Sequence, residues 1–205
     1  MDLARWQRLM NSLGMAEEIE AFHALIAAYS QEHRHYHTCK HIEHCLREFD
    51  SAPHVAHEPS EVEFALWFHD AIYDPYSSGN EEKSADWACL LLRKHGASSA
   101  RVDRVRAHIM ATCHDAQPAA LDSQLVVDID LSILGSDEIT YADFERTVRE
   151  EYRWIPSLVF RRRRAQILES FISRARIYST EPFHTRYESQ ARRNLEATIS
   201  ALRFG

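Results

Sequence analysis

Glycine is scarce in this chain of 205 residues: only five occur, and turn dipeptides of the hairpin type are nearly absent. Long stretches carry alanine, leucine, glutamate and arginine instead, which are residues of high helix propensity. The sequence therefore predicts an all-α fold. No linker rich in proline, glycine or serine divides the chain, so residues 1–205 are expected to form one domain with an ample core.

Several classes of partner lack their usual signals. The net charge is −7 and the pI is about 6.0, so no domain-wide positive field exists to hold a nucleic-acid polymer. No run of about 18 apolar residues could span a membrane, and the first residues, MDLARWQRLMNSLGM, do not have the design of a signal peptide. We expect a cytoplasmic protein with neither nucleic acid nor membrane as a partner. The sequence leaves the oligomeric state open.

Cysteine is also sparse, with four residues and no CxxC spacing. A chain of this length does not need disulfides to stabilise its core, so reduced thiols that mostly lie in the core are expected. Histidine is plentiful by contrast. Thirteen occur, and they are concentrated in residues 33–57 and 108–114.

The stretch EVEFALWFHDAIYD, residues 61–74, combines a very apolar pattern with two ionisable groups. Between Phe64 and Tyr73 the only polar residues are the adjacent His69 and Asp70. A helix that is apolar on all sides is normally buried, so we expect a buried helix that runs to about Tyr73 with the pair in its middle. A buried carboxylate without a partner costs roughly several kcal/mol, which an ion pair, hydrogen bonds or a metal would offset. A purely structural pair is the alternative.

Helical patterns cover most of the remaining chain. The segment LVVDIDLSILG alternates like a strand, but because no partner strand is evident we predict a buried helix. Caps and apolar periodicity predict the other helices, namely Asp2 to about Ser12, Glu17–Ser30, a helix after Thr38, Glu81–Lys94, a helix after Ser98 or Ser99, Tyr141–Trp154, Pro156–Ala175 and Phe183–Leu202.

Residues with metal-ligand chemistry fall on three of these predicted helices. They are His41, the pair His69 and Asp70, and an aspartate of the DID segment. Two imidazoles and two carboxylates suit a divalent ion that keeps positions open for water and substrate, whereas closed structural zinc sites favour cysteine. The composition predicts a catalytic metal site. A local zinc knot of His37, Cys39, His41 and His44 is an alternative, but it leaves the buried pair unexplained.

Five segments in order resemble the HD-domain superfamily of metal-dependent phosphohydrolases: YHTCKHIEHCL, ALWFHDAIYD, NEEKSA, HIMATCH and DIDLSILG. They most resemble its branch of small, stand-alone predicted phosphohydrolases, and the likeness covers most of the chain, including RIYSTEPFHTRYESQARRNLE. The resemblance implies an HD-type helical bundle in which a His, a vicinal His-Asp and a distant Asp bind one divalent metal. The matching residues are His41, His69, Asp70 and either Asp130 or Asp128.

Asp130 is the preferred fourth ligand, although Leu131 follows it directly and so departs from the family's pattern of a small residue, Asp, any residue and Leu. Apolar residues lie four positions before Asp130 and three and four positions after it, so an uncompensated carboxylate there would be especially costly. Two positions on a helix differ in direction by about 200°, so only one of the two aspartates can face a small site.

The resemblance further implies that a metal-activated water hydrolyses the phosphate ester of a small phosphorylated substrate, such as a nucleotide. The ion would be Mn, Fe, Co, Ni, Zn or Mg, about one per chain, with His108 and His114 leaving a second metal open. Asp70 would bind the ion and help take a proton from the water. Glu82 and His114 are candidates to contact substrate or protonate the leaving group.

Two other classes of protein remain open at this point. A regulatory protein could keep the metal and a nucleotide without turning anything over. A helical adaptor would require the His-Asp pair to be incidental.

Overall fold

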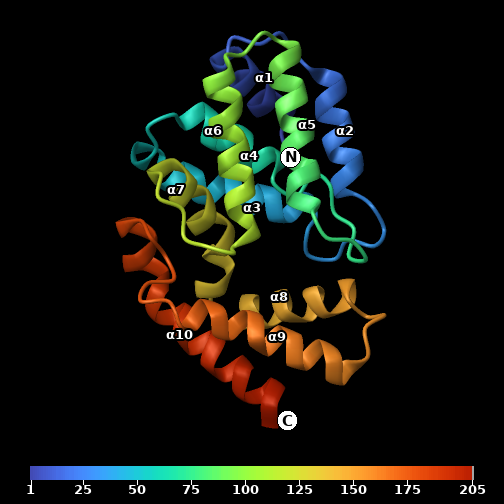
Figure 1. Cartoon of the computed structure of the whole chain (residues 1–205), viewed down its shortest axis with the longest axis vertical. Helices are drawn as coiled ribbons and strands as arrows, with labels where there is room; N and C mark the ends of the chain where they lie inside the picture. Colours follow the sequence, from blue (N-terminus) through green and yellow to red (C-terminus); the bar gives the residue numbers. More distant parts are fainter. Residues whose placement is uncertain (205) are drawn as a thin grey trace.

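The computed structural model describes residues 1–204, and every regular element within that range is helical (Figure 1), which confirms the all-α prediction. In chain order the elements are α1 (Leu3–Ser12), α2 (Ile19–Tyr29), α3 (Cys39–Ser51), the 3-10 helix η1 (Pro53–Val55), α4 (Pro59–Phe68), α5 (Asn80–Lys94), α6 (Ser99–Met110), η2 (Ala111–Cys113), α7 (Leu121–Asp130), η3 (Leu131–Gly135), α8 (Glu138–Glu151), α9 (Ser157–Ile172) and α10 (Glu181–Phe204).

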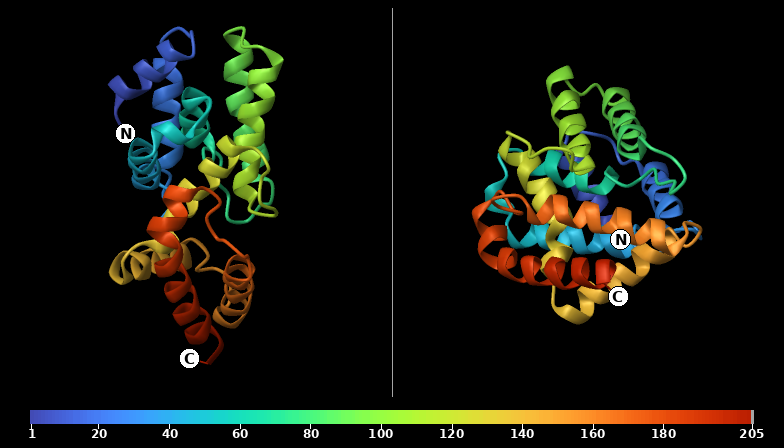
Figure 2. Two further views of the ribbon diagram at one scale, coloured as in Figure 1. Left: turned by 90° about the vertical axis from the view of Figure 1, so that its left-hand side faces the viewer. Right: turned by 60° about the horizontal axis from the view of Figure 1, so that its bottom comes forward.

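The helices form two groups (Figures 1 and 2). Helices α1 to α7 gather at one end of the molecule, and α8 to α10 form a layer at the other end. One continuous cluster of buried apolar side chains runs through both groups. The most extensive helix contacts are those of α5 with α6, of α9 with α10, and of α10 with η3. The end of α7 and η3 therefore connect the two groups.

Local capping explains where several helices begin and end. The Asp2 carboxylate accepts a hydrogen bond from the Ala4 amide at 2.9 Å, and the Ser98 hydroxyl accepts one from the Arg101 amide at 3.3 Å. Gly96, with φ of 74°, follows the end of α5 and adopts the left-handed conformation that glycine tolerates best. The segment LVVDIDLSILG forms the end of α7 and η3, so its prediction as a helix is confirmed.

The predicted extension of the central helix to Tyr73 is wrong. Helix α4 ends at Phe68, and His69 is the residue that follows it. His69 and Asp70 therefore lie at the C-terminal end of the helix and not in its middle. A turn, in which the Ala71 amide donates to the Phe68 carbonyl at 2.9 Å, replaces the next helical turn.

The buried guanidinium of Arg34 explains this early end. It donates to the carbonyl oxygen of Asp70 at 2.8 Å and to that of Ala71 at 3.0 Å. The Ser84 hydroxyl accepts from the Ile72 amide at 3.0 Å. Because side chains satisfy these backbone groups, the chain can leave the helix without burying unpaired polar atoms.

Within residues 1–204, no helix is both long and apolar enough to cross a lipid bilayer.

Helix α10 passes very close to η3, directly after the DID segment. A Cβ atom at Gly135 would lie 2.6 Å from the Cβ of Tyr187 and 2.8 Å from its carbonyl oxygen. Two hydrogen bonds also join α10 to this segment: the side-chain amide of Asn194 donates to the backbone carbonyls of Leu134 and Ser136 at 2.8 and 2.9 Å. The glycine permits the close packing that fixes η3 against α10.

We predict that Gly135→Ala lowers the free energy of unfolding by about 1 to 3 kcal/mol, because the overlap involves the backbone of Tyr187 as well as its side chain. The matched control is Ser136→Ala, which removes a hydroxyl that donates to the Ile133 carbonyl at 2.8 Å and should cost about 1 kcal/mol or less. Urea denaturation of both variants is the measurement. Equal losses would show that the close packing at Gly135 is not a constraint.

Candidate metal centre

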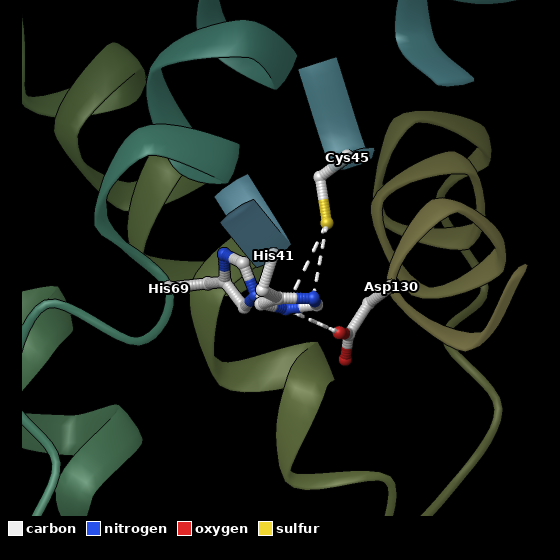
Figure 3. A group of neighbouring side chains, drawn as sticks. All are labelled: His41, Cys45, His69 and Asp130. Carbon is white, nitrogen blue, oxygen red and sulfur yellow. Dashed lines mark hydrogen bonds and ion pairs between the residues drawn. The ribbon is translucent and has the colours of Figure 1, made fainter. Parts of the chain in front are cut away.

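Three separate elements bring four side chains to one point. His41 comes from the first turn of α3, His69 and Asp70 follow α4, and Asp130 is the last residue of α7. Figure 3 shows His41, His69 and Asp130 converging. The Nε2 atom of His41 lies 3.1 Å from Nε2 of His69, 3.2 Å from Oδ1 of Asp130 and 3.4 Å from Oδ2 of Asp70. Nε2 of His69 lies 3.2 Å from Oδ2 of Asp70 and 3.6 Å from Oδ1 of Asp130.

These separations match what a shared ion requires. Ligand atoms held about 2.1 Å from one ion, at angles between about 90° and 110°, lie roughly 3.0 to 3.4 Å from one another. The distance between the two nitrogens and the four distances from a nitrogen to a carboxylate oxygen, 3.1 to 3.6 Å, lie in that range or just outside it. The side chains are buried or nearly so, with exposed fractions of 1% for both imidazoles, 16% for Asp70 and 15% for Asp130. The cluster can therefore hold a metal ion.

A backbone contact fixes the orientation of His69. Its Nδ1 atom lies 2.9 Å from the carbonyl oxygen of Leu66. Because a carbonyl can only accept, Nδ1 carries a proton, so Nε2 is the nitrogen that has the lone pair when the ring is neutral, and it faces the cluster. Metal-binding histidines are commonly held in this way.

The charges in the cluster require compensation. Burial alone would raise the carboxyl pKa values, but His69 and His37 hold the pKa of Asp70 well below its usual range, and His114, His41 and His69 do the same for Asp130. Burial would lower the pKa of His69, yet Asp70 and Asp130 raise it well above its usual value. Two buried carboxylates thus need two positive charges. One divalent cation would supply both and leave the imidazoles neutral.

Cys45 is a member of the group that the sequence analysis did not consider as a ligand. One potential ligand atom from each of His41, Cys45, His69 and Asp130 lies within 4.8 Å of the others (Figure 3). The Cys45 sulfur lies 3.7 Å from Nε2 and 3.8 Å from Nδ1 of His41. Nearly equal distances place the sulfur beside the ring and not in line with the Nε2 lone pair. The sequence did contain a signal for this proximity: His41 and Cys45 are four residues apart, which places them on the same face of α3.

The two aspartates of the DID segment face different partners, as their helical spacing predicts. Oδ1 of Asp130 faces the two imidazoles, and Oδ2 lies 2.9 Å from Nε2 of His114. Asp128 accepts hydrogen bonds from the Ser179 amide at 2.8 Å and from the amide and hydroxyl of Thr180, both at 2.6 Å. Asp130 is the aspartate that joins the cluster.

The relative burial of the two aspartates nevertheless differs from the sequence prediction. The sequence pattern indicated that Asp130 is the more deeply buried of the two, but Asp128 has an exposed fraction of 0%. Burial raises the pKa of Asp128 to about 6, against hydrogen bonds from residues 179 and 180 that lower it. Those donors come from the segment before α10, which local sequence patterns cannot place. The hydrogen bonds from Ser179 and Thr180 stabilise the buried Asp128 carboxylate, so it does not require a cation.

The other candidate residues lie at or outside the edge of the cluster. His114 has a φ of 58°, and its Nε2 meets the cluster at the outer oxygen of Asp130. The Glu82 side chain is 63% exposed and lies 3.6 Å from Arg106. His108 is buried, with Nδ1 2.8 Å from the Ser123 hydroxyl. His44 binds the Ser132 hydroxyl at 2.8 Å, so the residues of a local zinc knot are not brought together.

A cleft of about 1020 Å³ opens onto the cluster. Asp70, His114 and Asp130 form part of its lining, and residues from α8 and α9 form the opposite wall. Much of that wall is apolar, with Phe144, Val148, Phe160, Ile167 and Phe171. A molecule in this cleft would reach Asp70 and Asp130 from the side that faces α8 and α9.

Comparisons with protein-family models, with curated proteins and with solved structures each returned no match. The geometry of the described residues is therefore the basis for any functional conclusion.

We predict that wild-type protein binds about one Mn²⁺ per chain and that Asp130→Asn weakens this binding by at least about 100-fold, because it removes a charged ligand. Asp128→Asn is the matched control and should keep its metal, since its carboxylate faces Ser179 and Thr180. Metal stoichiometry after equilibrium dialysis distinguishes them. If Asp128→Asn is the variant that loses Mn²⁺, the assignment of the fourth ligand is wrong.

A second pair of variants separates Cys45 from Asp70. Cys45→Ala should retain Mn²⁺ to within about threefold, whereas Asp70→Ala should lose it. Oδ2 of Asp70 lies 3.4 Å from Nε2 of His41, nearer than the Cys45 sulfur at 3.7 Å, and 3.2 Å from Nε2 of His69, and Mn²⁺ prefers oxygen ligands to sulfur. Loading with Co²⁺ provides an independent check, since thiolate ligation produces an intense charge-transfer band in the near ultraviolet. Such a band, lost in Cys45→Ala, would make Cys45 a ligand.

Proposed function

We propose that this protein is an HD-type, metal-dependent phosphohydrolase that acts on a small phosphorylated substrate. One observation carries the proposal: two imidazole nitrogens and two carboxylate oxygens converge at the floor of a cleft of about 1020 Å³. The ordered HD-like segments of the sequence agree with it, because the four converging residues are the ones that the resemblance implies.

His41, His69, Asp70 and Asp130 would hold the ion. A bound divalent ion lowers the pKa of a coordinated water toward about 7 and polarises a phosphoryl oxygen. Asp70 lines the cleft and is partly exposed, so its carboxylate can accept a proton from the attacking water. Arg34 holds the backbone carbonyl of Asp70 at 2.8 Å and so restricts the position of that carboxylate.

His114 fits an orienting role better than that of an acid. Its Nε2 binds Asp130, and its Nδ1 is buried without a hydrogen-bond partner among the described residues. Asp130 therefore occupies Nε2, and burial keeps Nδ1 from a leaving group. Glu82 is largely exposed and lies near Arg106, so it has no fixed position at the reacting atoms.

The cleft supports a substrate with both an anionic and an apolar part. Its wall carries aromatic rings of Phe144, Phe160 and Phe171, which can contact an organic group. Arg163 also lines the cleft, and within residues 1–204 it makes no ion pair or hydrogen bond, whereas Arg164 binds Glu145 at 2.7 Å. A nucleotide or another small phosphorylated metabolite meets these conditions.

The test is hydrolysis of a panel of phosphomonoesters and phosphodiesters by untagged protein with added Mn²⁺, Co²⁺, Ni²⁺ or Mg²⁺. We predict turnover that EDTA abolishes and that Asp70→Asn lowers by at least about 1000-fold, because metal binding and proton transfer are lost together. His44→Ala is the control and should keep both metal and activity, since His44 binds Ser132.

Two outcomes would contradict the proposal. Bound metal without turnover of any ester would indicate a regulatory protein that binds a ligand at the same cleft. Absence of metal from the wild-type protein would indicate that the cluster is structural.

A further inference from the structure

His37 and Glu151 form a hydrogen-bonded pair beside the proposed metal site. His37 precedes α3, and its Nδ1 lies 2.7 Å from Oε2 of Glu151, the last residue of α8. Glu151 is buried, with an exposed fraction of 3%. The pair joins the two groups of helices, and the functions assigned so far to the cleft do not use it.

Glu151 is ionised in this setting. Oε1 accepts from the backbone amides of His35, Tyr36 and His37 at 2.8, 2.8 and 3.0 Å, and Oε2 accepts from the hydroxyl of Tyr73 at 2.9 Å. Burial would raise the pKa of Glu151, but His37 and these amides lower it to about 2. An ionised carboxylate can only accept hydrogen bonds, so Nδ1 of His37 must be the donor.

This arrangement leaves Nε2 of His37 as the nitrogen that can exchange protons. His37 and Asp70 both line the cleft, and the centroid of the His37 ring lies 6.0 Å from that of His41. The ring stacks on Tyr73 with a centroid distance of 4.2 Å, and the side chain is 21% exposed. Proton-transferring His-carboxylate pairs use the same arrangement: the carboxylate accepts a hydrogen bond from Nδ1, which fixes the tautomer and stabilises the imidazolium.

From this geometry we propose that His37 is the general acid of the reaction and that Glu151 is its positioning residue. The inference rests on the proposed phosphohydrolase function. An imidazole suits this task because it exchanges protons near neutral pH. His37 also meets the requirement that His114 and Glu82 do not, since it combines a fixed orientation with a nitrogen open to the cleft.

The step conserves atoms and charge. The oxygen of the attacking water forms a bond to phosphorus and gives up a proton to the Asp70 carboxylate. The bond between phosphorus and the ester oxygen breaks, and its electron pair stays on that oxygen. The proton on Nε2 of His37 moves to the same oxygen, which leaves as an alcohol. Solvent then reprotonates His37 and takes the proton from Asp70.

The test compares two substrates that differ in their need for an acid. We expect His37→Gln to slow Mn²⁺-dependent hydrolysis of phenyl phosphate by at least about 100-fold, and that of 2,4-dinitrophenyl phosphate by less than about fivefold, because dinitrophenolate leaves without protonation. Metal content should equal that of the wild type. His35→Gln, at the exposed neighbouring histidine, is the matched control and should leave both rates unchanged.

A second measurement does not depend on activity. Long-range ¹H–¹⁵N correlation spectra of the Zn²⁺-loaded protein should show His37 protonated at Nδ1 in its neutral form, and Glu151→Gln should change that tautomer population. A neutral His37 protonated at Nε2 would overturn the inference. Equal losses with the two esters would also overturn it while leaving the phosphohydrolase proposal intact. Wild-type protein that hydrolyses no ester of the full panel would overturn both proposals.

Discussion

The convergence of two carboxylates and two imidazoles in one nearly buried space is the constraint on which the rest of the structure depends. Buried carboxylates are stable only if their negative charge is neutralised, by protonated imidazoles or by a bound cation. His41, His69, Asp70 and Asp130 come from three elements, which must meet within a few tenths of an ångström for one ion to bind all four.

Three other buried charges hold the backbone next to these residues. Arg34 binds the carbonyl of Asp70, Glu151 binds three amides in the segment before His41, and Asp128 binds the amides of Ser179 and Thr180 at the start of α10. Each satisfies backbone groups that no helix satisfies. Removing one partner of such a buried hydrogen bond commonly costs about 1 to 3 kcal/mol, so the site and the fold are coupled.

The sequence predicted the helices well because apolar periodicity marks them, and local caps mark some of their ends, as Asp2, Ser98 and Gly96 illustrate. It also predicted that Asp128 and Asp130 face apart. It misplaced the end of α4, because the buried Arg34 that terminates it lies far away in the chain. The pairing of His37 with Glu151 was missed for the same reason: 114 positions separate the two residues, and no local pattern reports such a contact.

The most direct test of the account is the position of a bound ion. A crystal grown with Mn²⁺ should show one strong anomalous peak per chain within about 2.0 to 2.4 Å of Nε2 of His41, Nε2 of His69, Oδ2 of Asp70 and Oδ1 of Asp130. A peak on Cys45 that excludes Asp70 would change the ligand set. A cluster that binds no ion when Mn²⁺ is in excess would contradict the account.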